Sequence, residues 1–227
     1  MEKNIYEEGQ MILVDKPFEW TSFDVVRKIR YLTRTKKVGH AGTLDPLATG
    51  LLIVCTGKFT KKINEFMAKE KEYTGTITLG AITPTYDLES EPCNFKPVNA
   101  ITEEEIRKTT EQFTGSILQT PPIHSAIKKE GKRVYELARR GLDIQLEPRP
   151  VTITKFDIEK WESPVVHFRV VCSTGTYIRS LANDLGEQLG TGGYLSGLCR
   201  TRIGEYSLNE AFTIEQLEQQ IRKVQNG

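Results

Sequence analysis

The stretch from Val38 to Cys55 constrains the fold of this chain more than any other part of the sequence. Its centre is Asp45, which precedes a proline and lies among glycines that permit unusual backbone angles. These glycines are Gly39, Gly42 and Gly50. The run from Leu51 to Cys55 is short, apolar and rich in branched residues, which predicts a buried strand. We therefore expect Asp45 to lie on a shaped loop that a rigid strand holds in place.

The charge of the chain is unevenly distributed. The formal net charge is only +1, but the segment from Val25 to Lys71 carries eleven lysines and arginines against three acids, a local excess of +8. The segment from Thr76 to Glu111 has three bases and seven acids, which gives −4. A local basic excess of this kind is typical of a surface that contacts nucleic-acid phosphates, whereas Glu103, Glu104 and Glu105 suit the start of a helix capped by Thr102.

Length and composition indicate a cytoplasmic protein of one domain. A chain of 227 residues without an evident linker is long enough to bury a substantial core, so we expect a single domain over residues 1–227. No apolar run is long enough for a signal peptide or a membrane span. The cysteines form no Cys-x-x-Cys pair, and we expect reduced, mostly buried thiols. They are Cys55, Cys93, Cys172 and Cys199.

Hydrophobic periodicity predicts helices and strands that alternate without a regular β-α-β order, so we expect an α+β fold with a largely antiparallel sheet. One predicted helix starts at Thr21 and places Phe23, Val26 and Ile29 on its inner face, with a basic face opposite. The other helices are expected at 58–69, 102–113, 134–140, 176–189 and 213–224, and the strands at 11–14, 51–55, 73–79, 151–158, 165–173 and 195–202.

An isolated Asp-Pro pair is typical of an ordinary turn, but the longer string from Gly39 to Gly50 closely resembles the catalytic motif of pseudouridine synthases. The similarity is to the family that isomerises the T-arm uridine of tRNA, conventionally position 55. Further segments resemble other motifs of the same family, so the resemblance covers roughly the whole chain. They are Leu13 to Pro17, Lys71 to Tyr73, Ser116 to Lys128, Thr174 to Arg179 and Leu198 to Arg200, with Thr83 to Asp87 similar to a substrate-facing loop.

The resemblance implies a pseudouridine synthase fold, a mainly antiparallel sheet flanked by helices and loops around an active-site cleft. It implies that Asp45 is the catalytic carboxylate, which acts either by covalent attack or by assisting the loss of a proton from the sugar. It also implies that Arg179 keeps this carboxylate charged in a site without water, since a neighbouring guanidinium favours the ionised form. Tyr73 is expected to stack on the flipped base, and its hydroxyl is a candidate acid or base.

The resemblance also implies a set of substrate-binding residues. His40 is expected to fill the space that the flipped nucleotide leaves, and Leu198 to line the pocket. Tyr177 is expected to bind the substrate with them, and Lys16 is expected to support the active-site loop. No cofactor and no metal are implied, because the three histidines are scattered and form no zinc pattern.

The sequence leaves other interpretations open. The RNA could be different from tRNA, the chain could be a non-catalytic RNA-binding or chaperone domain, or Asp45 could be the nucleophile of a metal-dependent phosphohydrolase. Many members of the family carry an RNA-binding PUA domain after the catalytic domain. Because this chain ends at Gly227, just after the last predicted helix, we expect either a form that lacks the PUA domain or a chain truncated before it. We also expect a monomer.

Overall fold

The computed structural model describes residues 4–123, 128–129, 132–133 and 146–226. The residues cluster into two compact units. Unit 1 comprises Met1–Thr74 and Leu198–Gly227, and unit 2 comprises Gly75–Gly197. The single catalytic domain over residues 1–227 stays a prediction.

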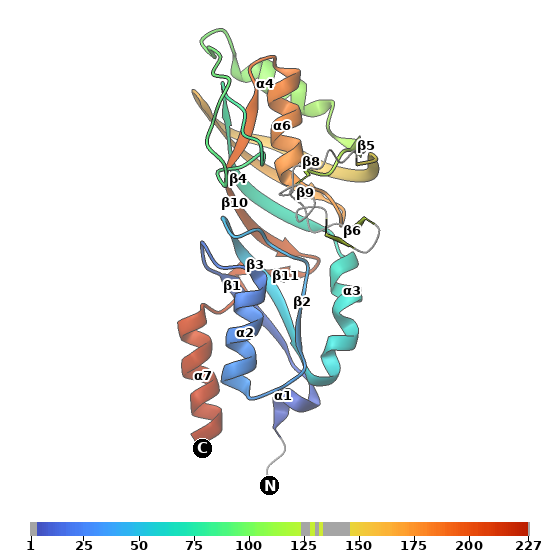
Figure 1. The fold of residues 1–227 in the computed structure, drawn as a ribbon, viewed down its shortest axis with the longest axis vertical. Helices are drawn as coiled ribbons and strands as arrows, with labels where there is room; N and C mark the ends of the chain where they lie inside the picture. Colours follow the sequence, from blue (N-terminus) through green and yellow to red (C-terminus); the bar gives the residue numbers. More distant parts are fainter. Residues whose placement is uncertain (1–3, 124–127, 130–131, 134–145, 227) are drawn as a thin grey trace. The chain divides into compact units, whose positions relative to one another are not determined.

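The centre of unit 1 is β3 (Ala48–Thr56), which pairs antiparallel with β1 (Met11–Lys16) along one edge (Figure 1). Its other edge is divided between two strands. Residues Ala48 to Gly50 pair in parallel with β10 (Gly193–Ile203), and residues Ile53 to Thr56 pair antiparallel with β2 (Val38–Ala41). Beside β10 lie β4 (Lys71–Leu79) and the short β11 (Tyr206–Ser207).

Helices cover both faces of the unit 1 strands. On one face, α2 (Ser22–Thr33) and α7 (Ile214–Asn226) pack together against Leu52 and Val54 (Figure 1). On the other face, Leu51, Ile53 and Cys55 pack with Phe66 of α3 (Ile63–Ala68). Because both faces of β3 are buried, its sequence is a continuous apolar run, as a strand covered on both sides requires. The remaining elements of unit 1 are α1 (Ile5–Glu8), η1 (Gly57–Lys62), α3 (Ile63–Ala68) and η2 (Leu208–Glu210).

One detail of the predicted helices in unit 1 was wrong. Phe23 is 59% exposed, because the buried stripe of α2 starts at Ser22 and continues through Val25, Val26 and Ile29, and Phe23 lies about 100° around the helix from Ser22. The predicted helix at 58–69 is confirmed in position: it begins as the 3₁₀ helix η1 and becomes α-helical at Ile63. The capping of α2 by Thr21 is confirmed, with a reciprocal bond to Asp24.

Unit 2 is built on an antiparallel sheet. The strand β8 (Arg149–Glu162) pairs with β9 (Val165–Cys172) on one side and with β5 (Gly115–Gln119) on the other. Within unit 2, β9 is followed in the sheet by β4 and then β10. The helices that the structure describes in unit 2 are α4 (Glu103–Glu111), which contacts β8, and α6 (Ile178–Gln188). A short hairpin joins β6 (Lys128–Lys129) and β7 (Lys132–Arg133).

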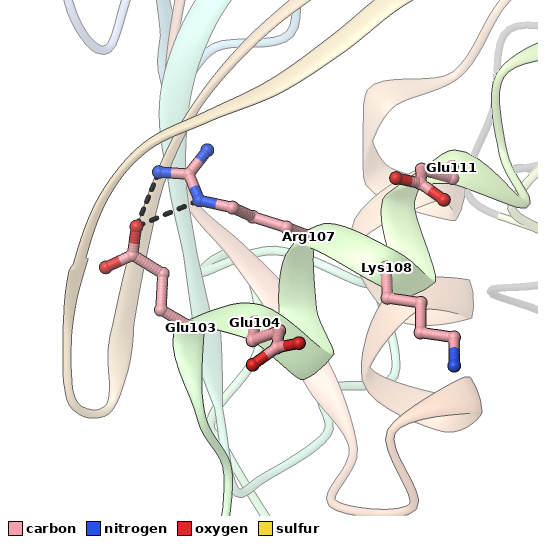
Figure 2. A pocket seen from close by; sticks show the side chains of 5 residues that line it. All are labelled: Glu103, Glu104, Arg107, Lys108 and Glu111. Carbon is pink, nitrogen blue, oxygen red and sulfur yellow. Dashed lines mark hydrogen bonds and ion pairs between the residues drawn. The ribbon is translucent and has the colours of Figure 1, made fainter.

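The acidic segment predicted at the start of α4 is confirmed. Thr102 caps the helix with a reciprocal bond to Glu105. Figure 2 shows that the outer face of this helix carries charges of both signs, with Arg107 turned back towards Glu103, whose Oε1 accepts a hydrogen bond from Arg107 Nε at 2.9 Å. The labelled side chains are three acids and two bases, so this face is slightly acidic rather than basic.

The predicted fold class is confirmed: the sheet is mixed and mostly antiparallel, and helices flank it. The predicted helix at 134–140 and the histidine His124 lie outside the described residues. In the part of the chain that the structure describes, no helix is both long and apolar enough to cross a membrane.

Candidate functional site

Asp45 lies in the loop between β2 and β3, and hydrogen bonds fix the backbone on both sides of it. The hydroxyl of Ser22, a buried residue of α2, accepts a hydrogen bond from Leu44 N–H at 2.9 Å and donates to the Leu44 carbonyl at 3.2 Å. On the other side, Ala48 N–H donates to the Asp45 carbonyl at 3.1 Å. The carboxylate is thus carried by a short loop whose neighbouring peptide groups are held by a helix and by the start of a strand.

Lys16 secures the same loop from β1. Its side chain is fully buried, and its ammonium group donates to the carbonyls of Pro17 at 2.9 Å, of Trp20, and of Pro46 at 3.2 Å. Burial lowers the pKa of Lys16 to about 8, and the nearby negative charge of Asp45 opposes this shift. Since Pro46 follows Asp45 directly, this side chain positions the loop through its backbone.

Arg200 of β10 is a third anchor of the loop, and the sequence did not single it out as such. It is 1% exposed, its Nε donates to the Leu51 carbonyl at 2.7 Å and its Nη2 donates to the Gly42 carbonyl at 3.0 Å. The backbone of Arg200 pairs with Gly50, whose φ of 98° favours glycine. A Cβ atom at Gly50 would lie 2.4 Å from the Arg200 carbonyl oxygen, so this glycine permits the close approach of the two strands.

His40 lies on β2, opposite Val54 of β3. Burial, and after it the positive charge of Arg200, lowers the pKa of His40 below its ordinary value, so the imidazole is neutral at neutral pH. Its Nδ1 atom is buried and has no hydrogen-bond partner among the described residues. An unpaired buried nitrogen is costly, and such atoms are often found where a ligand completes the site.

Tyr73 and Leu198 also belong to unit 1. The side chain of Tyr73 is buried on β4, and Leu198 is half-buried on β10. The backbone of Leu198 pairs with Ala48, and its carbonyl accepts a hydrogen bond from Thr49 Oγ1 at 3.4 Å. Leu198 therefore lies beside the first residues of β3, just after the Asp45 loop.

Tyr177 and Arg179 belong to unit 2, at the start of α6. Gln119, a buried residue of β5, binds both backbone groups of Tyr177: its Oε1 accepts from the Tyr177 N–H at 2.8 Å, and its Nε2 donates to the Tyr177 carbonyl at 3.0 Å. The hydroxyl of Ser180 donates to the Thr120 carbonyl at 2.8 Å. These bonds fix the first turn of α6 to the end of β5.

Arg179 is 5% exposed and faces an acid that the sequence did not identify as its partner. Its Nε lies 3.6 Å from Asp87 Oδ2, and its Nη1 donates to the Thr85 carbonyl at 3.3 Å. A loop of the composition of Thr83 to Asp87 is ordinarily exposed to solvent, but here Thr83, Thr85 and Asp87 are buried. The predicted charge pairing of Arg179 with Asp45 stays a prediction, since the two residues belong to different units.

The structure therefore divides the predicted site residues into two groups. Unit 1 holds Asp45 with Lys16, His40, Tyr73 and Leu198, and unit 2 holds Tyr177 and Arg179. Within the described ranges, no three His, Cys, Asp or Glu side chains are placed so that they could hold a metal ion.

The fold and the loop agree with one class of enzyme. The chain is similar to a chain in a crystal structure of a Cbf5–Nop10–Gar1 complex, with a TM-score of 0.73 and 29% identity over 94% of this chain. It is also similar to a chain in a structure of an H/ACA RNP bound to a substrate RNA containing 2′-deoxyuridine, with a TM-score of 0.71 and 27% identity over 95% of this chain. This chain spans 54% of the length of each of those two chains. The match is to the pseudouridine synthase fold.

Sequence comparison specifies the family within that class. Residues 30–178 match the model of the TruB family pseudouridylate synthase N-terminal domain, and residues 179–227 match the tRNA pseudouridylate synthase B C-terminal domain. The chain is 52% identical to the tRNA pseudouridine synthase B of Flavobacterium johnsoniae, over 96% of this chain and 98% of that one. It is 47% identical to the enzyme of the same name from Phocaeicola vulgatus, over 97% and 99% of the two chains. The chain belongs to the TruB family of pseudouridylate synthases, which confirms the predicted family and makes it an RNA isomerase.

Proposed function

We propose that this chain converts the T-arm uridine of tRNA, position 55, to pseudouridine and that Asp45 is the carboxylate on which the reaction depends. The names of the Flavobacterium and Phocaeicola relatives support a tRNA substrate. The observation that carries the catalytic part of the proposal is the anchoring of the Asp45 loop by Ser22, Lys16 and Arg200. A reaction that depends on one side chain requires that side chain to be held in position before the substrate arrives.

The reaction is an internal rearrangement of one nucleotide. The bond between uracil N1 and the sugar breaks, the ring turns, and C5 bonds to the same sugar carbon. The hydrogen on C5 then leaves as a proton and N1 takes up a proton, so the product is an isomer of the substrate. Atoms and electrons balance without a cofactor or redox partner. Asp45 initiates it either by covalent attack or by assisting proton loss from the sugar, and both routes need an ionised carboxylate that water does not surround. The ammonium group of Lys16 attracts that carboxylate, which favours its charged form.

The other predicted residues bind the nucleotide that is pulled out of the RNA. Flipping a base costs a few kcal/mol, and stacking on an aromatic ring returns roughly 1–3 kcal/mol, which is the role we assign to Tyr73. His40 takes the space left in the RNA, and the buried Nδ1 without a partner supports a polar contact there. The family resemblance assigns nucleotide binding to Leu198 and Tyr177 and a catalytic role to Arg179.

We also propose that the enzyme acts as a monomer in the cytoplasm. No disulfide links the four cysteines within the described residues, which suits a reducing compartment. The sequence signal that supported a reducing compartment was the lack of any Cys-x-x-Cys pair among these cysteines.

The test is incubation of the purified protein with unmodified tRNA, followed by mapping of pseudouridine by nucleotide position. We expect one modified position, in the T arm, and no modification of transcripts from which the T arm is deleted. Equal modification of both RNAs would contradict T-arm specificity. No pseudouridine in either would contradict the proposal, and loss of activity in a chelator would favour a metal-dependent reaction instead.

A further inference from the structure

Four lysines of unit 1 line a single hollow of about 410 Å³, at some distance from the Asp45 loop. Two of them, Lys36 and Lys37, follow α2, and the other two, Lys58 and Lys61, lie on η1. Glu7 of α1 also lines this space, which we call the lysine hollow. Its lining therefore carries four basic side chains and one acid.

The backbone brings the two lysine pairs together. Gly57, which precedes Lys58, donates its N–H to the Lys37 carbonyl at 2.8 Å. Its φ is 51°, and a Cβ atom at this position would lie 2.2 Å from the Glu7 carbonyl oxygen, so only glycine fits between the segments. Thr60 Oγ1 donates to the Gly57 carbonyl at 2.7 Å. The lysine hollow is thus a built feature of the fold rather than a chance meeting of long side chains.

The ammonium groups of the lysine hollow have no ion-pair partner in the described part of the chain. Among the residues that the structure describes, none of these four lysines forms an ion pair within 4.0 Å, whereas other lysines do. Lys28 pairs with Glu218 at 2.7 Å, and Lys155 pairs with Asp157 at 2.6 Å. Like charges gathered within one Debye length, about 8–10 Å at physiological salt, repel one another and attract anions.

The position of the lysine hollow follows from the register of unit 1. The strand β3 begins at Ala48, just after Asp45, and ends at Thr56, just before Gly57. Nine residues of strand rise roughly 26 Å from first to last. Lys37 is at the same end, because Val38 pairs with Thr56. The hollow and the catalytic loop therefore lie at opposite ends of one rigid strand.

We propose that the lysine hollow binds phosphates of the tRNA backbone outside the T loop, so that unit 1 holds the RNA at two separated places. This inference rests on the proposed function, because it takes tRNA as the substrate. Lysine is depleted in protein–protein interfaces, which argues against a protein partner. The compact ammonium group of lysine binds phosphate as a point charge without fixed geometry. No aromatic side chain is among the residues that line the hollow, so the contact is with the backbone and not with stacked bases.

The test compares the double variant Lys58→Gln/Lys61→Gln with the matched control Lys155→Gln/Lys160→Gln. The control removes two exposed lysines of β8 that pair with Asp157 and Glu162. Binding is measured by filter retention for whole unmodified tRNA and for a hairpin that contains the T arm alone, each over a series of salt concentrations. Pseudouridine formation is measured on the same samples, and circular dichroism checks that both variants fold.

We expect Lys58→Gln/Lys61→Gln to bind whole tRNA several-fold more weakly than the wild type does. Its slope of log K against log salt concentration should be smaller in magnitude than that of the wild type by about one unit for each lysine removed. Binding of the T-arm hairpin and turnover at saturating RNA should match the wild type, as should all values for the control. An unchanged slope on whole tRNA would overturn the inference, and so would an equal loss on the hairpin. Absence of pseudouridine with the wild type would refute the proposed function but not the binding result, so the two failures are distinguishable.

Discussion

Replacing Ser22 by alanine removes the side chain that holds the peptide groups next to Asp45. The Leu44 N–H loses its 2.9 Å acceptor, and the Leu44 carbonyl loses a 3.2 Å donor. Both groups are in the interior, since Ser22 is 2% exposed and Leu44 is 3% exposed. A buried donor without a partner costs about 1–3 kcal/mol, so we expect the free energy of unfolding to fall by about 2 kcal/mol.

The larger effect of this substitution is expected on catalysis. Displacing a catalytic group by about 1 Å can reduce a rate by roughly 100-fold, and a freed Leu44 allows Asp45 to move. We expect Ser22→Ala to lower kcat by roughly 10-fold to 100-fold while the KM for tRNA stays near the wild-type value. Turnover is measured with tRNA that carries tritium on uridine C5, because formation of the new bond at C5 releases that hydrogen to water.

The neighbouring residue provides a matched control. Thr21 caps α2 through its Oγ1, which accepts a hydrogen bond from Asp24 N–H at 3.0 Å. Thr21→Ala is expected to cost about 1 kcal/mol of stability, as for other helix caps. Its side chain has no bond to the Asp45 loop among the hydrogen bonds of the described residues, so kcat should be unchanged. Wild-type turnover in Ser22→Ala, or an equal loss of turnover in Thr21→Ala, would refute the reasoning.

Three further predictions concern other parts of the site. The pKa of Lys16 is about 8 in the folded protein against 10.5 ordinarily, so the folded state releases this proton at a lower pH than the unfolded state does. The free energy of unfolding should therefore rise by roughly 3 kcal/mol between about pH 8 and 10.5. A denaturant titration that shows the same pH dependence in Lys16→Met would contradict this prediction. Gln119→Leu removes the two hydrogen-bond partners of the Tyr177 backbone and should lower the melting temperature and kcat. Gln119→Glu keeps the oxygen that accepts from the Tyr177 N–H, so its losses should be smaller. Equal losses in the two variants would count against the role of that oxygen. If Tyr73 acts mainly by stacking, Tyr73→Phe should bind tRNA better than Tyr73→Ala, and equal losses in a binding assay would point to the hydroxyl.

The elements that are determined by local pattern were predictable from the sequence. The strand β3 is buried on both faces and is a continuous apolar run, and the caps of α2 and α4 follow from Thr21 and Thr102 with an acid three residues later. The shaped loop at Asp45 follows from its glycines and Pro46. Each of these features depends on residues that are close together in the chain.

The features that were missed depend on residues far apart in the chain. The guanidinium of Arg200 reaches the Gly42 carbonyl, and that of Arg179 faces Asp87, and neither pair shows any pattern along the sequence. An arginine in a strand otherwise indicates an exposed position, so the burial of Arg200 becomes clear only from the parallel pairing of β10 with β3. The orientation of Phe23 was mistaken because its apolar character fitted the helical period, although Ser22 begins the buried stripe.

The most direct test of the central claim is the effect of Asp45→Asn on pseudouridine formation in whole tRNA. Asparagine has nearly the same shape as aspartate but carries no charge, so the loop anchors at Leu44 and Pro46 should persist. We predict no detectable pseudouridine in the T arm with tRNA affinity close to that of the wild type. Formation of pseudouridine at the wild-type rate by this variant would show that Asp45 is not the carboxylate on which the reaction depends.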